Sequence, residues 1–127
     1  MPDYTAVRKH DMEVHGRGFL KARASLGVSS FGMQITRMPP SYRDYPEHDH
    51  LDDGQEEVYM ALDGGGWIDI EGERVELYPG VMVRIAPHTR RKVFSGPMGL
   101  EMLTIGACPG EPYKIVPFTE LTSGPST

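Results

Sequence analysis

Two histidines separated by a single residue, His48 and His50, are the side chains of this sequence best suited to chemistry. In an extended segment, side chains two positions apart leave the same face, about 7 Å apart along the chain. Two imidazoles at that spacing can bind one metal ion together. Glu57 starts the next apolar segment and offers a carboxylate oxygen. This set leaves coordination positions open, which suits one divalent ion (iron, manganese, nickel or zinc) with a bound substrate or water.

Two alternatives to this ligand set follow from the same residues. Gln55 has the same parity along the chain as Glu57 and stands nearer to His50, so it competes with Glu57 or adds a fourth ligand. A histidine pair of this kind can also be two solvated loop residues that bind no metal.

The segments that must position these side chains show the alternation of β-strands. Alternating apolar residues predict strands near 28–38, 57–62, 67–70, 81–85 and 99–105. Turn signals, such as the glycine run at 64–66 and Pro79-Gly80, recur roughly every 8 to 12 residues, which is typical of all-β sandwiches and barrels. One short helix is expected, from Gly18 to Ser25 and ended by Gly27. Trp67 is expected in the core.

Composition limits the class of protein. The chain has 127 residues, of which 39% are hydrophobic, so we expect a single domain over 1–127 with a core over about 28–107 and a flexible tail over about 119–127. Thirteen basic and 18 acidic residues give a net charge of −5, which disfavours binding to nucleic acids or anionic membranes. A lone cysteine, Cys108, excludes an internal disulfide. No stretch is apolar enough for a membrane span, and a cytoplasmic location is expected.

The sequence resembles the cupin family, whose small jelly-roll barrels carry two short metal-site motifs. The first motif has His-x-His, a few residues, a glutamate, six residues and a glycine, and here His48, His50, Glu57 and Gly64 match it. The interval from His50 to Glu57 is longer than the family usually has. The resemblance covers about residues 28–107.

The second cupin motif is matched only in the turn residues that flank its strand. Pro79-Gly80 and Ala86-Pro87 agree with these turns, but His88 stands where the family usually has glycine. Arg91 stands where the last metal-binding histidine belongs. The resemblance therefore implies the all-β, antiparallel jelly-roll fold and a site with three or four ligands.

The resemblance also implies a range of functions, because cupins include dioxygenases, decarboxylases, sugar isomerases and ligand-binding domains. The leading hypothesis is a stand-alone, metal-binding cupin that acts on a small molecule as a dioxygenase or isomerase. In this hypothesis His48, His50, Glu57 and Gln55 hold the metal, and Arg91 orients an anionic substrate.

Two other interpretations of Arg91 remain open. Arg91 can pair with Glu57 and replace the metal, which leaves a ligand-binding pocket lined by Tyr59, Gln55 and Arg91 without turnover. Alternatively, Arg91 and its two basic neighbours, Arg90 and Lys92, form a solvated face opposite the acidic loop. A homodimer is also expected, because an apolar N-terminal strand that contains VSSFGMQI would otherwise expose its edge.

Overall fold

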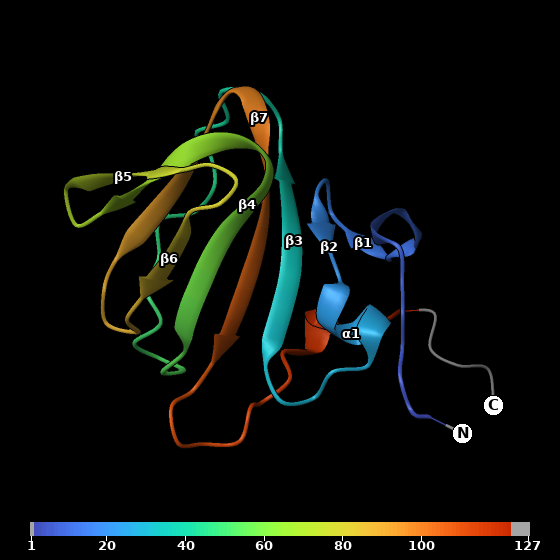
Figure 1. Cartoon of the computed structure of the whole chain (residues 1–127). Helices are drawn as coiled ribbons and strands as arrows, with labels where there is room; N and C mark the ends of the chain where they lie inside the picture. The colour runs from blue at the N-terminus through green and yellow to red at the C-terminus, as the bar shows by residue number, and fades with distance from the viewer. Residues whose placement is uncertain (1, 123–127) are drawn as a thin grey trace.

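The computed structural model of the chain describes residues 2–122, which form one antiparallel sheet wrapped into a barrel (Figure 1). The strands are β1 (Val14–His15), β2 (Phe19–Leu20), β3 (Gly32–Met38), β4 (Glu56–Ile70), β5 (Glu73–Leu77), β6 (Met82–Ile85) and β7 (Arg91–Ala107). The helical elements are η1 (Lys9–Asp11), α1 (Ala22–Leu26) and η2 (Pro117–Thr119). None of these described helices has the length and apolar character needed to span a membrane. The predicted all-β jelly-roll fold is confirmed.

Two long strands, β4 and β7, form the centre of the barrel. The sheet order is β1-β2-β3-β7-β4-β5, and β6 pairs with β4 beside it. The two strands predicted at 57–62 and 67–70 are one strand, because the glycine run bends the chain and does not reverse it. The register of β4 on β7 shifts at this bend, between Gly64 and Gly66 among other positions. The strand predicted at 99–105 likewise extends back to Arg91.

The N-terminal region also differs from the prediction. Gly18, Phe19 and Leu20 are not helical, because Phe19 and Leu20 pair with β3. Leu20 is 1% exposed and belongs to a second apolar cluster, so the core begins before residue 28. The helix α1 starts at Ala22 and ends, as predicted, at Gly27, whose φ of 78° is the left-handed conformation that glycine adopts readily.

The inward face of β4 carries two polar residues at the start of the strand. Glu57, Tyr59 and Ala61 are buried, whereas Leu62 on the alternate face is 43% exposed. The barrel interior is apolar further along the strand, where Ile68 packs with the main core cluster. The first residues of β4 therefore bring a carboxylate and a phenol into the end of the barrel.

The edge on which the homodimer expectation rests is only partly covered. β3 pairs with β7 over its whole length, from Gly32 to Met38, and on its other side it pairs with β2 at Ile35 and Thr36 only. The part of VSSFGMQI before Ile35 therefore has no strand partner on that side within residues 2–122. The homodimer itself stays a prediction.

The C-terminal segment, residues 108–122, crosses back over the N-terminal arm (Figure 1). Lys21 is 2% exposed, and its Nζ donates to the Glu13 carboxylate at 2.5 Å and to the Glu120 carbonyl at 2.7 Å. The backbone N–H of Thr122 donates to the same carboxylate at 3.0 Å. The tail predicted from residue 119 is thus anchored as far as Thr122, and residues 123–127 lie outside the described residues.

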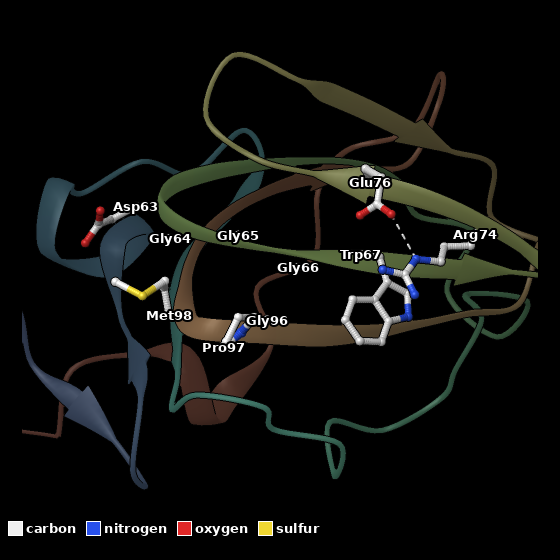
Figure 2. Close-up of a pocket in the computed structure, with 10 residues that line it drawn as sticks. All are labelled: Asp63, Gly64, Gly65, Gly66, Trp67, Arg74, Glu76, Gly96, Pro97 and Met98. Atoms are coloured by element: carbon white, nitrogen blue, oxygen red, sulfur yellow. Dashed lines mark hydrogen bonds and ion pairs between the residues drawn. The ribbon is translucent and has the colours of Figure 1, made fainter.

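Trp67 lies on the outer surface at the bend of β4 and not in the core. Trp67 is half-buried, and its ring stacks on Phe94 with centroids 5.2 Å apart. The Arg74 guanidinium covers the Trp67 ring, 4.0 Å from its centroid (Figure 2). Trp67 precedes the buried Ile68, so strand alternation turns the indole outward. The prediction of a core tryptophan was wrong.

The bend of β4 depends on Gly66. A Cβ atom on Gly66 would lie 2.0 Å from the carbonyl oxygen of Phe94, whereas one on Gly65 would lie 3.3 Å from its nearest atom. We expect Gly66→Ala to lower the free energy of unfolding by about 2–4 kcal/mol, because the backbone of β7 must move. Gly65→Ala, the matched control, should cost less than half as much in urea denaturation. Equal effects of the two variants would contradict this account of the bend.

Candidate metal centre

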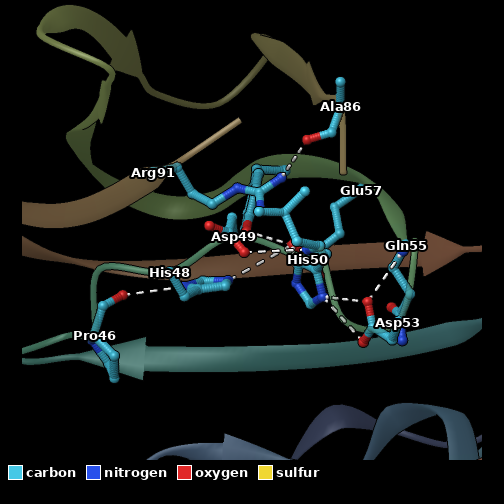
Figure 3. A network of polar contacts seen from close by, with 11 residues as sticks. Pro46, His48, Asp49, His50, Asp53, Gln55, Glu57, Ala86 and Arg91 are labelled. Atoms are coloured by element: carbon cyan, nitrogen blue, oxygen red, sulfur yellow. Dashed lines mark hydrogen bonds and ion pairs between the residues drawn. The ribbon is translucent and has the colours of Figure 1, made fainter. Parts of the chain in front are cut away.

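His48, His50 and Glu57 converge at one end of the barrel (Figure 3). Backbone hydrogen bonds attach the histidine loop to the start of β7: His48 and Arg91 exchange two N–H···O bonds of 2.9 Å, and the His50 N–H donates to the Pro87 carbonyl at 2.8 Å. Glu57 is the second residue of β4 and is 7% exposed. One ligand atom from each of the three side chains lies within 4.8 Å of the other two.

Both imidazoles are oriented through Nδ1. The Nδ1 of His48 lies 3.1 Å from the Pro46 carbonyl oxygen, which can only accept, so that nitrogen carries the hydrogen. The Nδ1 of His50 lies 2.9 Å from a carboxylate oxygen of Asp53. In the neutral rings the lone pair is therefore on Nε2. Such partners at the far ring nitrogen are the usual way in which proteins orient histidines that bind metals.

Both Nε2 atoms face the same oxygen of Glu57. Oε1 of Glu57 lies 3.0 Å from Nε2 of His50 and 3.9 Å from Nε2 of His48. It also accepts a hydrogen bond of 2.6 Å from the Tyr59 hydroxyl. Burial by itself raises the pKa of Glu57, but the two imidazoles and the phenol outweigh it and hold the pKa well below its usual range. The carboxylate is thus ionised and has a fixed position.

The three side chains fit a divalent ion. Nε2 of His50 is buried and has no hydrogen-bond partner within the described part of the chain, although Glu57 is close. Lone pairs of two imidazoles and a carboxylate that meet at this spacing repel one another unless a cation or a proton lies among them. Two nitrogens and one oxygen are ligands that suit iron, nickel, manganese or zinc.

Gln55 lies beside this site, just before β4. Its backbone N–H donates to Asp53 at 3.1 Å, and its side chain lines the same cavity as the two histidines. Gly106 on β7 leaves the necessary space, since a Cβ there would lie 2.9 Å from Oε1 of Gln55 and 3.1 Å from Cγ of Glu57. Glu57 is the residue that faces both imidazoles, and a role for Gln55 as a fourth ligand stays a proposal.

Arg91 is fully buried, at 0% exposure, so the interpretation as part of a solvated face was wrong for this residue. That interpretation holds for Arg90, which is exposed and pairs with Glu47 and Asp49. The expected Arg91–Glu57 pair is also not formed. The Arg91 side chain extends toward the loop before β7, where Nη2 donates to the Ala86 carbonyl at 3.2 Å (Figure 3).

The Arg91 guanidinium therefore has no neutralising partner among residues 2–122. Its Nε and Nη1 have no hydrogen-bond partner there, and no described carboxylate forms an ion pair with it. A buried cation in this condition is costly. Its charge acts on the centre at a distance, since it opposes the burial and the Glu57 charge that raise the pKa of Tyr59.

The candidate centre opens into a chamber of about 180 Å³. The chamber also contains side chains that the sequence analysis did not single out, from the N-terminal arm, from β3 and β7, and from the C-terminal segment: Phe19, Gln34, Tyr45, Thr104, Tyr113, Val116, Phe118 and Thr119. Thr104 shares the inward parity of Leu100 and Met102, so alternation would have identified it. No local pattern in the sequence indicates that the C-terminal segment covers the chamber.

Solved structures with the same fold are numerous. A cupin protein from Bacteroides fragilis superposes with a TM-score of 0.67 and 26% identity, over 100% of this chain and 99% of that one. The chain has the fold of these cupin proteins. It also resembles a sugar phosphate isomerase of the cupin superfamily from Silicibacter pomeroyi, with 21% identity, a TM-score of 0.60, and coverage of 70% of this chain and 57% of that one.

A third similar structure is a Cupin_2 domain of a transcriptional regulator of the XRE family from Enterobacter cloacae. It has 19% identity and a TM-score of 0.54, and the match covers 65% of this chain and 86% of that domain. No family model matches the sequence, and no curated protein matches it. At these identities the likeness establishes the fold, and the chemistry has to be argued from the chain's own side chains.

The protein should bind one divalent ion per chain at this centre. We expect His48→Ala combined with His50→Ala to abolish binding of Zn²⁺ or Fe²⁺, because only a carboxylate and a weak amide ligand then remain. Metal content of protein purified without a histidine tag, measured by mass spectrometry, checks the stoichiometry. His88→Ala is the control, because His88 is exposed and outside the centre. Unchanged metal content in the double variant would contradict the assignment.

Metal affinity should also depend on pH. The Glu57 carboxylate raises the pKa of His50 above 6.5, although burial opposes it, so the protonated ring persists to higher pH than in an ordinary histidine. A protonated imidazole cannot coordinate, so the affinity should be full above that pKa and fall as the pH is lowered through it. Isothermal titrations with Zn²⁺ between pH 8 and about pH 5 measure this loss.

Proposed function

We propose that this protein binds one divalent ion and acts on a small molecule held in the adjoining chamber, as a dioxygenase or an isomerase. The observation that carries the proposal is the convergence of two Nε2 lone pairs and an ionised carboxylate at the end of a cavity of about 180 Å³. Similar barrels include a sugar phosphate isomerase and a structure described among DMSP lyases. A cytoplasmic location and a homodimer remain part of the proposal.

The bound ion and Tyr59 would have different roles in this proposal. When bound, the ion would polarise a carbonyl or hydroxyl oxygen, or lower the pKa of a water molecule. Tyr59 is 1% exposed, and burial and the Glu57 charge raise its pKa far above the ordinary value. The hydroxyl therefore stays protonated and donates a hydrogen bond to Glu57. Tyr59 therefore positions the carboxylate.

We assign Arg91 an electrostatic role toward an anionic substrate. The guanidinium is buried behind the centre and is not among the residues that line the chamber, so its action on a bound anion is through charge. A full positive charge near the site favours an anionic ligand or an anionic intermediate. This role differs from direct substrate contact, which the orientation toward Ala86 disfavours.

A metal-free ligand-binding module is the second candidate, and the Arg91 charge is the observation that favours it. A buried cation beside His48, His50 and Glu57 repels a divalent ion. Without metal, a protonated His50 can pair with Glu57 across their 3.0 Å separation, and Tyr59 satisfies the same carboxylate. The pocket would then bind a small molecule without turnover.

Arg91→His should tighten metal binding. Imidazole replaces a buried guanidinium, which removes the repulsive charge at the position of the family's last histidine ligand. We expect the Zn²⁺ affinity to increase at least tenfold in isothermal titration. Arg90→His is the matched control, since Arg90 is exposed and should leave the affinity unchanged. Equal affinities of Arg91→His and the parent protein would show that the Arg91 charge does not act on the centre.

Tyr59→Phe should weaken metal binding without loss of the fold. The substitution removes only the hydroxyl that donates to Glu57. Loss of a group that hydrogen-bonds to a metal ligand lowers metal affinity about 10–100-fold. The pH profile of Zn²⁺ affinity separates this role from a general loss of packing, because Glu57 should become easier to protonate. A profile identical to that of the parent protein would contradict the positioning role.

Reaction type is tested with the Fe²⁺-loaded protein and a panel of small hydroxy-carbonyl compounds. Oxygen uptake identifies a dioxygenase, and exchange of substrate carbon-bound hydrogen in D₂O identifies an isomerase. Binding of a compound by the metal-free protein, without either signal in the loaded protein, would support the binding module and contradict the enzyme.

A further inference from the structure

We propose that a groove next to the chamber binds the phosphate or carboxylate group of an organic anion whose hydroxyl or carbonyl end enters the chamber. This outer groove has a volume of about 670 Å³ and lies between the β1–β2 arm, the end of β3 and the loop that follows β3. The inference rests on the proposed function and identifies its substrate class.

The outer groove and the chamber are adjacent. Phe19 and Tyr45 line both of them, so these two rings form the common wall. A ligand of a few carbon atoms can therefore extend from the groove past the two rings toward His48 and His50. The aromatic faces suit the carbon skeleton of such a ligand.

Charge is segregated between the two cavities. Within residues 2–122, no lysine or arginine lines the chamber, whereas the groove is lined by Arg17 and Arg37 and by no aspartate or glutamate. This is unexpected in a chain with 18 acidic and 13 basic residues. The chamber thus suits the uncharged, polar end of a ligand, and the groove suits its oxyanion.

The positive charge in the groove is only partly neutralised by nearby acids. Arg37 shares the Glu101 carboxylate with Lys9, so two cations face one anion. Arg17 is exposed and has no ion pair in the described part of the molecule. The planar guanidinium of an arginine matches two oxygens of a phosphate or carboxylate at once.

The backbone holds the two arginines on one rim. The Arg37 N–H donates to the Gly18 carbonyl at 2.8 Å, and a Cβ on Gly18 would lie 2.3 Å from the Arg37 carbonyl oxygen. Only glycine permits this close approach, which keeps the residue before it, Arg17, next to the end of β3. The position of Arg17 is therefore fixed by the fold, although its side chain is exposed.

A buried hydroxyl indicates that the groove receives a polar group. Thr36 lines the groove and is 7% exposed. Its Oγ1 lies near the Tyr45 phenol and opposes the burial that raises the pKa of that phenol, but it forms no hydrogen bond of good geometry among the described residues. Buried hydroxyl groups are nearly always paired with protein, ligand or ordered water. A ligand oxygen in the groove would satisfy Thr36 while the arginines bind the charge.

The test uses the full chain, zinc-loaded and metal-free, with glycerol, glycerate, glycerol 3-phosphate and inorganic phosphate as probes in NMR titrations. We expect glycerol 3-phosphate or glycerate to bind at least tenfold more tightly than glycerol, and the tighter of the two identifies the oxyanion. Arg17→Gln should lower that affinity about tenfold and leave glycerol binding unchanged. Thr36→Val should lower it as well. Arg74→Gln, an exposed arginine on the outer surface near Trp67, is the control.

The outcomes separate this inference from the proposed function. If zinc binds but both anions bind no better than glycerol, or if Arg17→Gln has the same affinities as the parent, the anion groove is refuted and the metal centre stands. If no metal binds while Arg17-dependent binding of glycerol 3-phosphate or inorganic phosphate persists, the groove stands and the metalloprotein is refuted. An equal loss in Arg74→Gln would indicate a general charge effect and refute the groove.

Discussion

The burial of one carboxylate, that of Glu57, is the constraint on which the rest of this site depends. An ionised carboxylate inside a barrel is costly by several kcal/mol unless donors or cations compensate it. Here Tyr59 donates from the same strand face, and His48 and His50 approach from a loop. The imidazoles compensate the carboxylate only when a proton or a cation lies between their Nε2 atoms and Oε1 of Glu57. That requirement is the physical reason why these three residues fit a metal ion.

The fold supplies this arrangement through non-local pairing. β4 and β7 present their inward faces to one another, and the loop that contains His48 is hydrogen-bonded to the start of β7 at Arg91. The C-terminal segment then covers the chamber and is fixed by the buried Lys21–Glu13 pair. The backbone of the histidine loop is therefore held by residues far from it in sequence, whereas sequence neighbours (Pro46, Asp53 and Tyr59) orient the three side chains.

Sequence alone predicted the barrel and the His48–His50–Glu57 set, because strand alternation and the same-face spacing of two histidines are local properties. It did not predict the direction of Arg91, which depends on the Ala86 carbonyl, or the outward position of Trp67. The glycine run has the composition of a turn, and the close approach of Gly66 to β7, which makes it a bend, is visible only in three dimensions. Residues 108–122 cover the chamber, but no periodic pattern in their sequence indicates this, because the contact likewise depends on the three-dimensional fold.

The most direct test of the account is the ¹H–¹⁵N long-range correlation spectrum of the imidazoles, recorded at pH 8.5 before and after one equivalent of Zn²⁺. The account predicts that both His48 and His50 carry hydrogen on Nδ1 in the metal-free protein. It further predicts that both Nε2 signals shift on addition of zinc while the Nδ1 signals keep their protonated character. Nε2-protonated rings, or zinc addition that leaves both Nε2 signals unmoved, would contradict the central claim that these lone pairs and Glu57 form one metal centre.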